Sequence, residues 1–366
     1  MRTGTIRGYV ILSPPSTASL GRGVRLLILN SLQPAKPWLE TVSGREPVLA
    51  AETRRFVVLN ADDVGICRGV NRAVVEAHLH GILTSASVMA NGIALEHALE
   101  HVVANCPQLG VGVHLCLTAG TSVAAAADLP DLVDRSGRFR HSFTSLLWSL
   151  RGRPPTLVRQ IEIELNAQVE KLVRLGVKLD HVDGHRYVHM LPGVFEVVVK
   201  LARMHGRMWV RRPLERTGSV RCWRLPGRCW SRFKNWPKQL LLGMLCRHHH
   251  WPSDLPSADH FHGVLDSGAM TGPVLEHLLA HAAPGVTEIV VHPGLPPERD
   301  EAIPSAADTA FLSSPLRRVE LDALCQLRWL HEFPGCHPCL ATFNSLTDAT
   351  RGNPQTAATL TTKDSR

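Results

Sequence analysis

The stretch Phe56-Val57-Val58-Leu59-Asn60-Ala61-Asp62-Asp63 joins an apolar run directly to two adjacent carboxylates. Its apolar residues predict a buried strand, and the carboxylates stand where that strand ends. Neighbouring like charges repel, so a fold usually keeps them together for a cation, a helix N-terminus or a proton transfer. The simplest alternative is that Asp62 or Asp63 only caps a helix that begins near Arg68.

Histidines further along the chain favour a metal site over a helix cap. His114 lies in the strand-like run 109–117, and a second run, 181–189, carries polar residues at every other position. If the second run is extended, these residues share one face, and imidazoles suit a buried strand only where that face opens onto a polar site. They are His181, Asp183, His185, Tyr187 and His189. One carboxylate and two histidines from separate strand ends form a ligand set for a catalytic divalent metal.

Four longer motifs extend this pattern in order along the chain: Asn60–Gly65, Gly81–Ser87, Gly112–Gly120 and His181–Pro192. With these motifs the chain resembles the YdjC-like carbohydrate deacetylases, which include chitooligosaccharide deacetylases. The resemblance extends from about Arg54 to about Thr347, and shorter matches such as Val291–Gly294 support it.

The resemblance implies roles for five residues. It makes Asp63, His114 and His185 the metal ligands, Asp62 the general base and His292 the general acid. Mixed carboxylate and imidazole ligands suit Zn²⁺ and do not exclude Mg²⁺, so the expected cofactor is one of these divalent metals.

Two residues depart from the family pattern. Val64 replaces a phenylalanine, which we expect to affect packing, and Tyr187 replaces a third histidine. Tyr187 does not match a metal ligand, so we expect it beside the metal and shaping the choice of substrate. His189, Arg211 and Thr118 are the other residues expected to contact substrate or to support the ligands.

Strand-like and helical segments alternate along the chain, which indicates parallel strands joined by helices in an α/β fold. The predicted strands are 55–60, 83–89, 110–117, 178–183, 207–211 and 287–292. The predicted helices are 68–80, 94–104, 155–175, 193–205, 271–282 and 315–330. The resemblance implies a deformed (β/α) barrel, TIM-barrel-like, as a single catalytic domain. Both arguments place the site at the C-terminal ends of the strands.

The 366 residues, 44% of them hydrophobic, are enough for one large core. We predict a poorly ordered basic extension over 1–52, a deacetylase domain over 53–348 and a disordered tail over 349–366. The nine cysteines form no repeated framework, which favours reduced thiols in the cytoplasm. Cys336 and Cys339 form a lone CxxC, which we interpret as structural or incidental, because a zinc ribbon needs a second pair and a thioredoxin-like motif needs a strand-to-helix junction. No apolar run is long enough to predict a transmembrane segment.

The net charge of +8 is concentrated in one segment. Between Arg203 and Arg247 the sequence has twelve Lys or Arg and one acid, Glu215, with four tryptophans interleaved. We interpret about 212–258 as a basic, Trp-rich insertion. It is either a solvated insertion whose aromatic residues pack on the barrel or a surface for substrate or lipid headgroups, with nucleic acid as the least favoured partner. We expect 203–251 to form part of the cleft wall, with Arg211 facing inward.

The expected reaction is metal-assisted removal of an N-acetyl group from an amino sugar or oligosaccharide, whether free or lipid-linked. The same ligand set would also serve another metal-dependent hydrolase, an amidohydrolase or a phosphoesterase. A non-catalytic binding protein on the same fold is the third alternative, with Tyr187 as the sign of lost function. The sequence is also compatible with a homodimer.

Overall fold

A parallel sheet forms the centre of the structure, a computed structural model that describes residues 54–215, 228–303, 306–328 and 338–350. The strands pair in the order β5-β4-β3-β2-β1-β7-β6, and β8 pairs with the start of β1. Because β5 and β6 stand at the two ends of this order, the described strands form an open half-barrel. Their bounds are β1 (Arg55–Val64), β2 (Ser85–Val88), β3 (Gly110–Leu115), β4 (His181–Gly184), β5 (Trp209–Val210), β6 (His260–His262), β7 (Gly285–Val291) and β8 (Cys339–Leu340).

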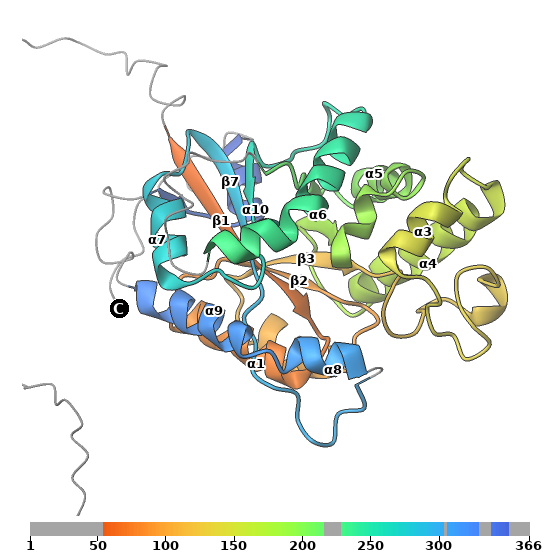
Figure 1. The fold of residues 1–366 in the computed structure, drawn as a ribbon, viewed down its shortest axis with the longest axis horizontal. Coiled ribbons are helices and arrows are strands. Elements are labelled where there is room, and N and C mark those ends of the chain that lie inside the picture. Colours follow the sequence, from red (N-terminus) through yellow and green to blue (C-terminus); the bar gives the residue numbers. More distant parts are fainter. Residues whose placement is uncertain (1–53, 216–227, 304–305, 329–337, 351–366) are drawn as a thin grey trace, which may run out of the picture. The chain divides into compact units, whose positions relative to one another are not determined.

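Helices lie around this sheet, and α1 packs beside α9 on one side of it (Figure 1). The α-helices are α1 (Arg68–Leu79), α2 (Leu95–Ala98), α3 (Phe143–Ser149), α4 (Pro155–Arg174), α5 (Val194–Met204), α6 (Arg228–His248), α7 (Gly272–Ala280), α8 (Ala306–Leu312), α9 (Pro315–Gln326) and α10 (Phe343–Thr350). A π-helical turn, η2 (Leu99–Val103), continues α2, and two 3₁₀ helices are η3 (Ala126–Asp128) and η4 (His185–Met190).

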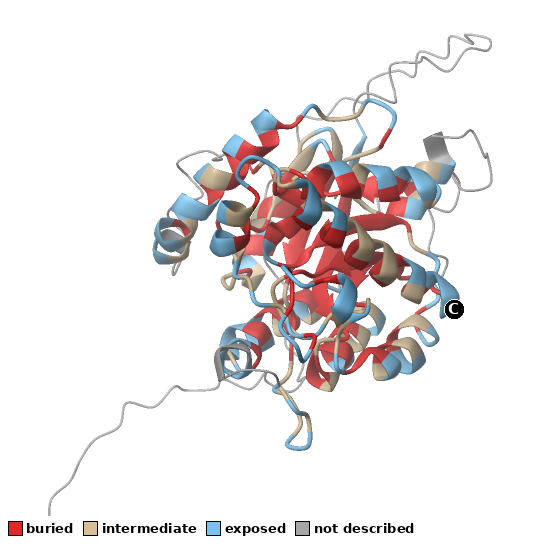
Figure 2. Cartoon of the chain, turned by 90° about the vertical axis from the view of Figure 1, so that its right-hand side faces the viewer, coloured by how far each residue is buried: buried red, intermediate tan, exposed pale blue. Residues whose placement is uncertain are grey.

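The elements follow the apolar pattern of the sequence. In α4 a proline starts the helix, where its missing N–H costs nothing, and apolar residues spaced by three or four face inward. In β1 the successive residues Val57, Val58 and Leu59 are all fully buried, as expected for a parallel strand covered on both faces. Figure 2 shows the result, with buried strands at the centre and exposed residues on the outer faces of the helices.

The predicted fold class is confirmed, and each predicted strand and helix is present with small changes at its ends. The strands and α-helices that were not predicted are β6, β8, α3, α6, α8 and α10, and the two 3₁₀ helices η3 and η4 were not predicted either. Strands β6 and β8 are too short to show a pattern. Helix α6 was missed because apolar residues lie on both its buried and its exposed face, which obscures the helical period.

The run 181–189 is extended only as far as Gly184, so the condition under which its alternate residues would share one face is not met beyond that point. Strand β4 ends at Gly184, and the chain turns into η4, where Arg186 and Tyr187 have positive φ angles of 54° and 63°. Only His181 and Asp183 therefore share a strand face, and the later residues of the run reach their positions through the turn. The alternative that Asp62 or Asp63 caps α1 is wrong, because Cys67 is the N-cap and the first backbone N–H of the helix, that of Arg68, donates to the carboxylate of Glu301 at 2.6 Å.

Several predictions concern the chain ends. The predicted extension 1–52, most of the predicted tail from 349 and Cys336 of the CxxC lie outside the described residues, while α10 continues to Thr350. Part of the basic, Trp-rich insertion, 216–227, lies outside them as well. Within the described ranges, every helix is too short or too polar to cross a membrane.

Candidate metal centre and active site

The end of β1 turns both neighbouring carboxylates toward the C-terminal edge of the sheet. Successive residues of a regular strand point to opposite faces, but the register between β1 and β2 shifts between Ala61 and Val64. Asp63 has a φ of 69°, in the left-handed region that few residues other than glycine and asparagine or aspartate tolerate. Both carboxylates are buried, Asp62 at 5% and Asp63 at 2% exposure. Local backbone strain at this position is therefore part of how the site is built.

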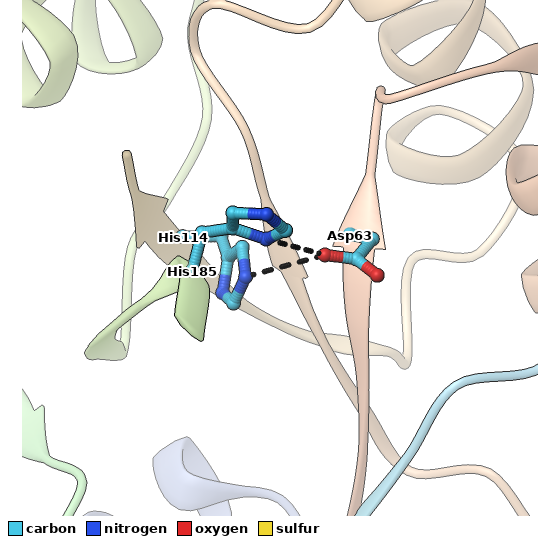
Figure 3. A group of neighbouring side chains, drawn as sticks. All are labelled: Asp63, His114 and His185. Atoms are coloured by element: carbon cyan, nitrogen blue, oxygen red, sulfur yellow. Dashed lines mark hydrogen bonds and ion pairs between the residues drawn. The ribbon is translucent and has the colours of Figure 1, made fainter. Parts of the chain in front are cut away.

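Asp63, His114 and His185 converge on one point (Figure 3). Oδ1 of Asp63 lies 2.9 Å from Nδ1 of His185 and 3.4 Å from Nε2 of His114. One donor atom from each of the three residues falls within 4.8 Å of the others, and all three side chains are buried. Burial alone would raise the pKa of Asp63, but hydrogen bonds with the two histidines hold that pKa well below its usual value. The carboxylate is therefore ready to bind a cation.

A second carboxylate fixes the orientation of His114. Nδ1 of His114 lies 2.6 Å from Oδ1 of Asp183, the buried aspartate of β4. Metal-binding histidines commonly hold a carboxylate with the ring nitrogen that does not face the metal. Burial tends to raise the pKa of Asp183, but Arg211 and His114 lower it overall, so the group stays ionised. This contact leaves Nε2 of His114 to face Asp63.

Arg211, which directly follows β5, ties the carboxylates of three strands together. Its guanidinium donates to both oxygens of Asp62 at 2.8 Å, to Asp183 at 2.6 Å and to Glu288 of β7 at 2.7 Å. The side chain is almost fully buried, and its planar fork matches a carboxylate held by both oxygens. Arg211 therefore fixes Asp62 in position and compensates the negative charge that gathers at this edge of the sheet.

A polar network continues beneath the site from strand to strand. Ser87 of β2 donates to Asp183 at 2.6 Å, and its hydroxyl lies 3.1 Å from Nε2 of His181. Asn60 of β1 donates to both Ser87 and Asp62, at 2.8 and 2.9 Å. Gly112 of β3 leaves the space that the His181 ring fills, since a Cβ there would overlap the ring.

The loop after β7 and helix α9 close another side of the site. Arg317 of α9 is buried and places Nη1 3.2 Å from Oδ2 of Asp63. His292 is half-buried, and its backbone N–H donates to the carboxylate of Glu320 at 2.6 Å. Burial lowers the pKa of His292 to about 4, against the opposing charges of Asp62 and Asp63. The imidazole is therefore neutral at neutral pH.

The remaining predicted residues surround these groups in different ways. Tyr187 is buried, and burial raises the pKa of its phenol well above the usual value, so it stays protonated. His189 is fully buried with Nε2 3.2 Å from the carbonyl of Arg211, and burial lowers its pKa to about 3. Thr118 is half-buried, and its Oγ1 has no hydrogen-bond partner among the described residues.

Lys238 of α6 enters the same region. Its Nζ lies 4.6 Å from the centre of the Tyr187 ring, within reach of a cation–π contact. The side chain is exposed to solvent, yet the surrounding protein lowers the pKa of its ammonium to about 8 although Asp62 and Glu215 attract the charge. Lys238 is thus surrounded by protein but still reached by water.

Residues 56–331 match the family model described as YdjC-like protein, which covers well over half of the chain. The chain belongs to the YdjC-like family. Over 161 residues it is 42% identical to a carbohydrate deacetylase of Brevibacillus brevis, an alignment that covers 43% of this chain and 59% of that protein. A chitooligosaccharide deacetylase of Proteus mirabilis is 36% identical over 149 residues, covering 40% of this chain and 55% of the relative. The YdjC-like chain thus spans less than two thirds of the length of these curated relatives.

The fold of the YdjC-like chain also occurs in a solved structure from Enterococcus faecalis V583, provisionally named a cellobiose-phosphate cleavage protein. The two share a TM-score of 0.58 at 22% identity, over 80% of this chain and 99% of that one. At this level of identity the similarity establishes the fold alone.

Sequence reasoning named the three converging residues and Asp62, but it gave no role to four other members of the site. Asp183 was noticed only within its run, although its place between His181 and His185 was a usable signal. Glu288 interrupts the apolar strand β7 with a charge, which marks a buried polar site. Arg317 and Lys238 lie on helices far along the chain, and nothing in the sequence connects them to β1.

Proposed function

We propose that this YdjC-like protein is a metal-dependent hydrolase that removes an N-acetyl group from an amino sugar or oligosaccharide. The observation that carries the proposal is the convergence of Asp63, His114 and His185, with Asp62 held beside them by Arg211. The similarity to proteins named carbohydrate deacetylase and chitooligosaccharide deacetylase supports the choice of reaction and substrate.

The donor set fits a divalent metal. One carboxylate and two imidazoles leave a position open for water or substrate, and the bond between His114 and Asp183 fixes which ring nitrogen faces the other donors. A bound ion would polarise the amide carbonyl and lower the pKa of a water. We propose Zn²⁺ or Mg²⁺ as the ion, with Asp63, His114 and His185 as its protein ligands.

We propose that Asp62 is the general base. Arg211 holds both of its oxygens, and Asn60 donates to one of them, so the carboxylate has a fixed direction from which to accept a proton from the attacking water. Arg211 is a positioning residue in this scheme, because its donors are occupied by Asp62, Asp183 and Glu288.

His292 is the proposed proton donor to the departing amine, which is a very poor leaving group as an anion. Because its pKa of about 4 keeps it neutral at neutral pH, His292 has no stored proton to give in the resting protein. We propose that it passes on the proton that Asp62 takes from water. Thr118, Tyr187 and Lys238 are the proposed substrate contacts, whereas the full burial of His189 suits a role in holding the backbone at Arg211.

The test is acetate release from N-acetylated chito-oligosaccharides by the full chain, first stripped with a chelator and then supplied with Zn²⁺ or Mg²⁺. We expect activity to disappear with the chelator and to return with one of the ions. The same ion should raise the melting temperature, since a ligand at about 100 times its Kd adds roughly 2.7 kcal/mol to stability.

Two other results would each identify a different function. Phosphate release from sugar phosphates without acetate release would point to a phosphoesterase. Tight metal binding with neither product would point to a non-catalytic binding protein. We also propose a cytoplasmic location, because six cysteines of the described residues are free thiols.

A further inference from the structure

Helix α6 carries a row of large apolar side chains on its outer side. Trp230, Phe233, Trp236, Leu240 and Met244 are 73, 72, 36, 50 and 57% exposed. We call these five residues the α6 stripe. Their spacing of three or four places them on one side of the helix, along roughly 20 Å of its length. The other large exposed apolar residues of the described chain are distributed over several elements, as is usual for a protein surface.

The opposite side of α6 is already fixed against the protein. Leu242, Leu245 and Cys246 are buried in a cluster that includes Tyr187 and Phe195. Arg232 is also buried, with its guanidinium 3.1 Å from the carboxylate of Asp266. The helix is therefore held in one orientation by its buried side. The α6 stripe faces outward although the helix already has an apolar surface that packs on the protein.

The charge of α6 indicates what kind of partner covers the stripe. The sequence 228–248 contains five Lys or Arg and no Asp or Glu, and the adjoining segment 216–227 adds three arginines without an acid. Lys234 and Arg247 are exposed beside the stripe. A second copy of this chain would bring two such basic helices together, which like-charge repulsion disfavours. A surface that binds nucleic acid has cations across the whole contact area, whereas the α6 stripe consists of apolar and aromatic side chains only.

An anionic lipid surface suits both features. Interfacial helices place aromatic and aliphatic side chains among the acyl chains, with lysines and arginines at the level of the headgroups. We propose that the α6 stripe docks this protein on an anionic lipid bilayer. Lys238 lies on the same helix and contacts the Tyr187 ring, so docking through α6 would bring the wall of the active site close to the headgroups.

The first experiment is co-sedimentation of the full chain with vesicles of phosphatidylcholine, with and without about 30% phosphatidylserine. We expect binding to the anionic vesicles and weak binding to the neutral ones. The double variant Phe233→Ser/Leu240→Ser should bind the anionic vesicles at least about tenfold more weakly, because it removes two immersed side chains. The matched control, Leu79→Ser/Leu175→Ser, removes two exposed leucines of other elements and should bind like the wild type.

Charge and folding are tested with the same assay. Lys234→Glu/Arg247→Glu should reduce the preference for anionic vesicles, and high salt should have the same effect on the wild type. All variants should keep the wild-type melting temperature and the wild-type rate of acetate release from a soluble oligosaccharide. This separates the docking proposal from the proposed reaction, since either can fail while the other holds.

Two results would overturn the proposal. One is equal vesicle binding by the wild type and by Phe233→Ser/Leu240→Ser, or no vesicle binding at all. The other is a wild-type dimer that the same double variant converts to a monomer in light-scattering measurements, which would assign the α6 stripe to self-association.

Discussion

Asp62 and Asp63 are neighbours in the chain, but the structure surrounds them with different groups. Both Nη atoms of Arg211 donate to the carboxylate of Asp62. The carboxylate of Asp63 instead faces His114, His185 and Arg317. This difference supports a division of labour, in which Asp63 binds the cation and Asp62 moves the proton. An amide in place of either carboxylate would preserve shape and remove charge, so it separates the two roles.

We expect Asp62→Asn to keep a metal content near that of the wild type and to lose roughly 10²–10⁴-fold in turnover, as for a lost general base. Asp63→Asn should lose metal affinity as well, because it removes an anionic ligand. Metal analysis and acetate release measure the two effects. Asp322→Asn, which removes an exposed carboxylate of α9, is the control and should change neither. Equal metal loss in the Asp62 and Asp63 variants would contradict the assignment.

Tyr187 is one of the two residues at which we expect this protein to depart from the family pattern. We expect Tyr187→His to change the preference among oligosaccharides more than the metal content, because the phenol contacts Lys238 and is not among the three converging donors. Histidine also tolerates the left-handed φ of 63° at this position. Tyr187→Phe keeps the ring face without the hydroxyl and separates the two contributions. If Tyr187→His instead binds metal much more tightly and only then gains activity, Tyr187 is a lost ligand.

At the scale of elements, the packing of α1 against the loop after β7 decides where His292 stands. Gly69, near the start of α1, lies so close to this loop that a Cβ there would overlap the carbonyl oxygens of Leu295 and Pro296. The backbone N–H of Leu295 also donates to the carbonyl of Gly69 at 3.2 Å. The end of a flexible side chain can move away from a new Cβ, but these backbone atoms cannot. The close distance between the helix and the loop therefore requires glycine at this position.

Gly69→Ala should therefore lower stability by about 1–3 kcal/mol, the usual cost of overpacking, and should reduce turnover by displacing His292. Thermal unfolding and acetate release provide the measurements. The control is Gly243→Ala in α6, where the nearest atom to a new Cβ is the end of Arg247 at 3.6 Å. This variant should be as stable as the wild type or slightly more so, since alanine favours a helix. An unchanged melting temperature for Gly69→Ala would show that the loop after β7 moves to accommodate the new Cβ at no cost in stability.

At the scale of the whole molecule, the site depends on many buried ionisable groups, and folding stability must follow pH. His189 is the clearest case outside the proposed ligands, because burial lowers its pKa to about 3 from an ordinary value of about 6.5. Between these values the unfolded chain binds a proton that the folded protein does not. The contribution of His189 is therefore fully present above pH 6.5 and is lost as the pH falls toward 3.

His189→Asn should accordingly lose less stability than the wild type when the pH is lowered from 7 to 5, by about 2 kcal/mol. Denaturant unfolding at the two pH values measures this difference, and only the change with pH is compared because the substitution also alters packing. His80→Asn, at an exposed position after α1, should follow the wild type. Parallel pH dependence of wild type and His189→Asn would show that folding does not lower the pKa of His189.

The sequence alone predicts the order and type of most elements, because their buried residues recur with a strand or helix period in a short stretch of chain, whereas α6 lacks a clear period and was missed. It also indicated Asp63, His114 and His185, since each lies at or just after the end of a recognisable strand. The direction of the site's side chains and their contacts with distant residues depend on the tertiary structure, because short sequence patterns contain no information about either. The left-handed turn at Asp63 and the turn of η4 aim the side chains, and Arg211, Glu288, Arg317 and Lys238 meet the site from elements far apart in the chain. Charges placed by packing, rather than by neighbours in sequence, set the electrostatics of this site.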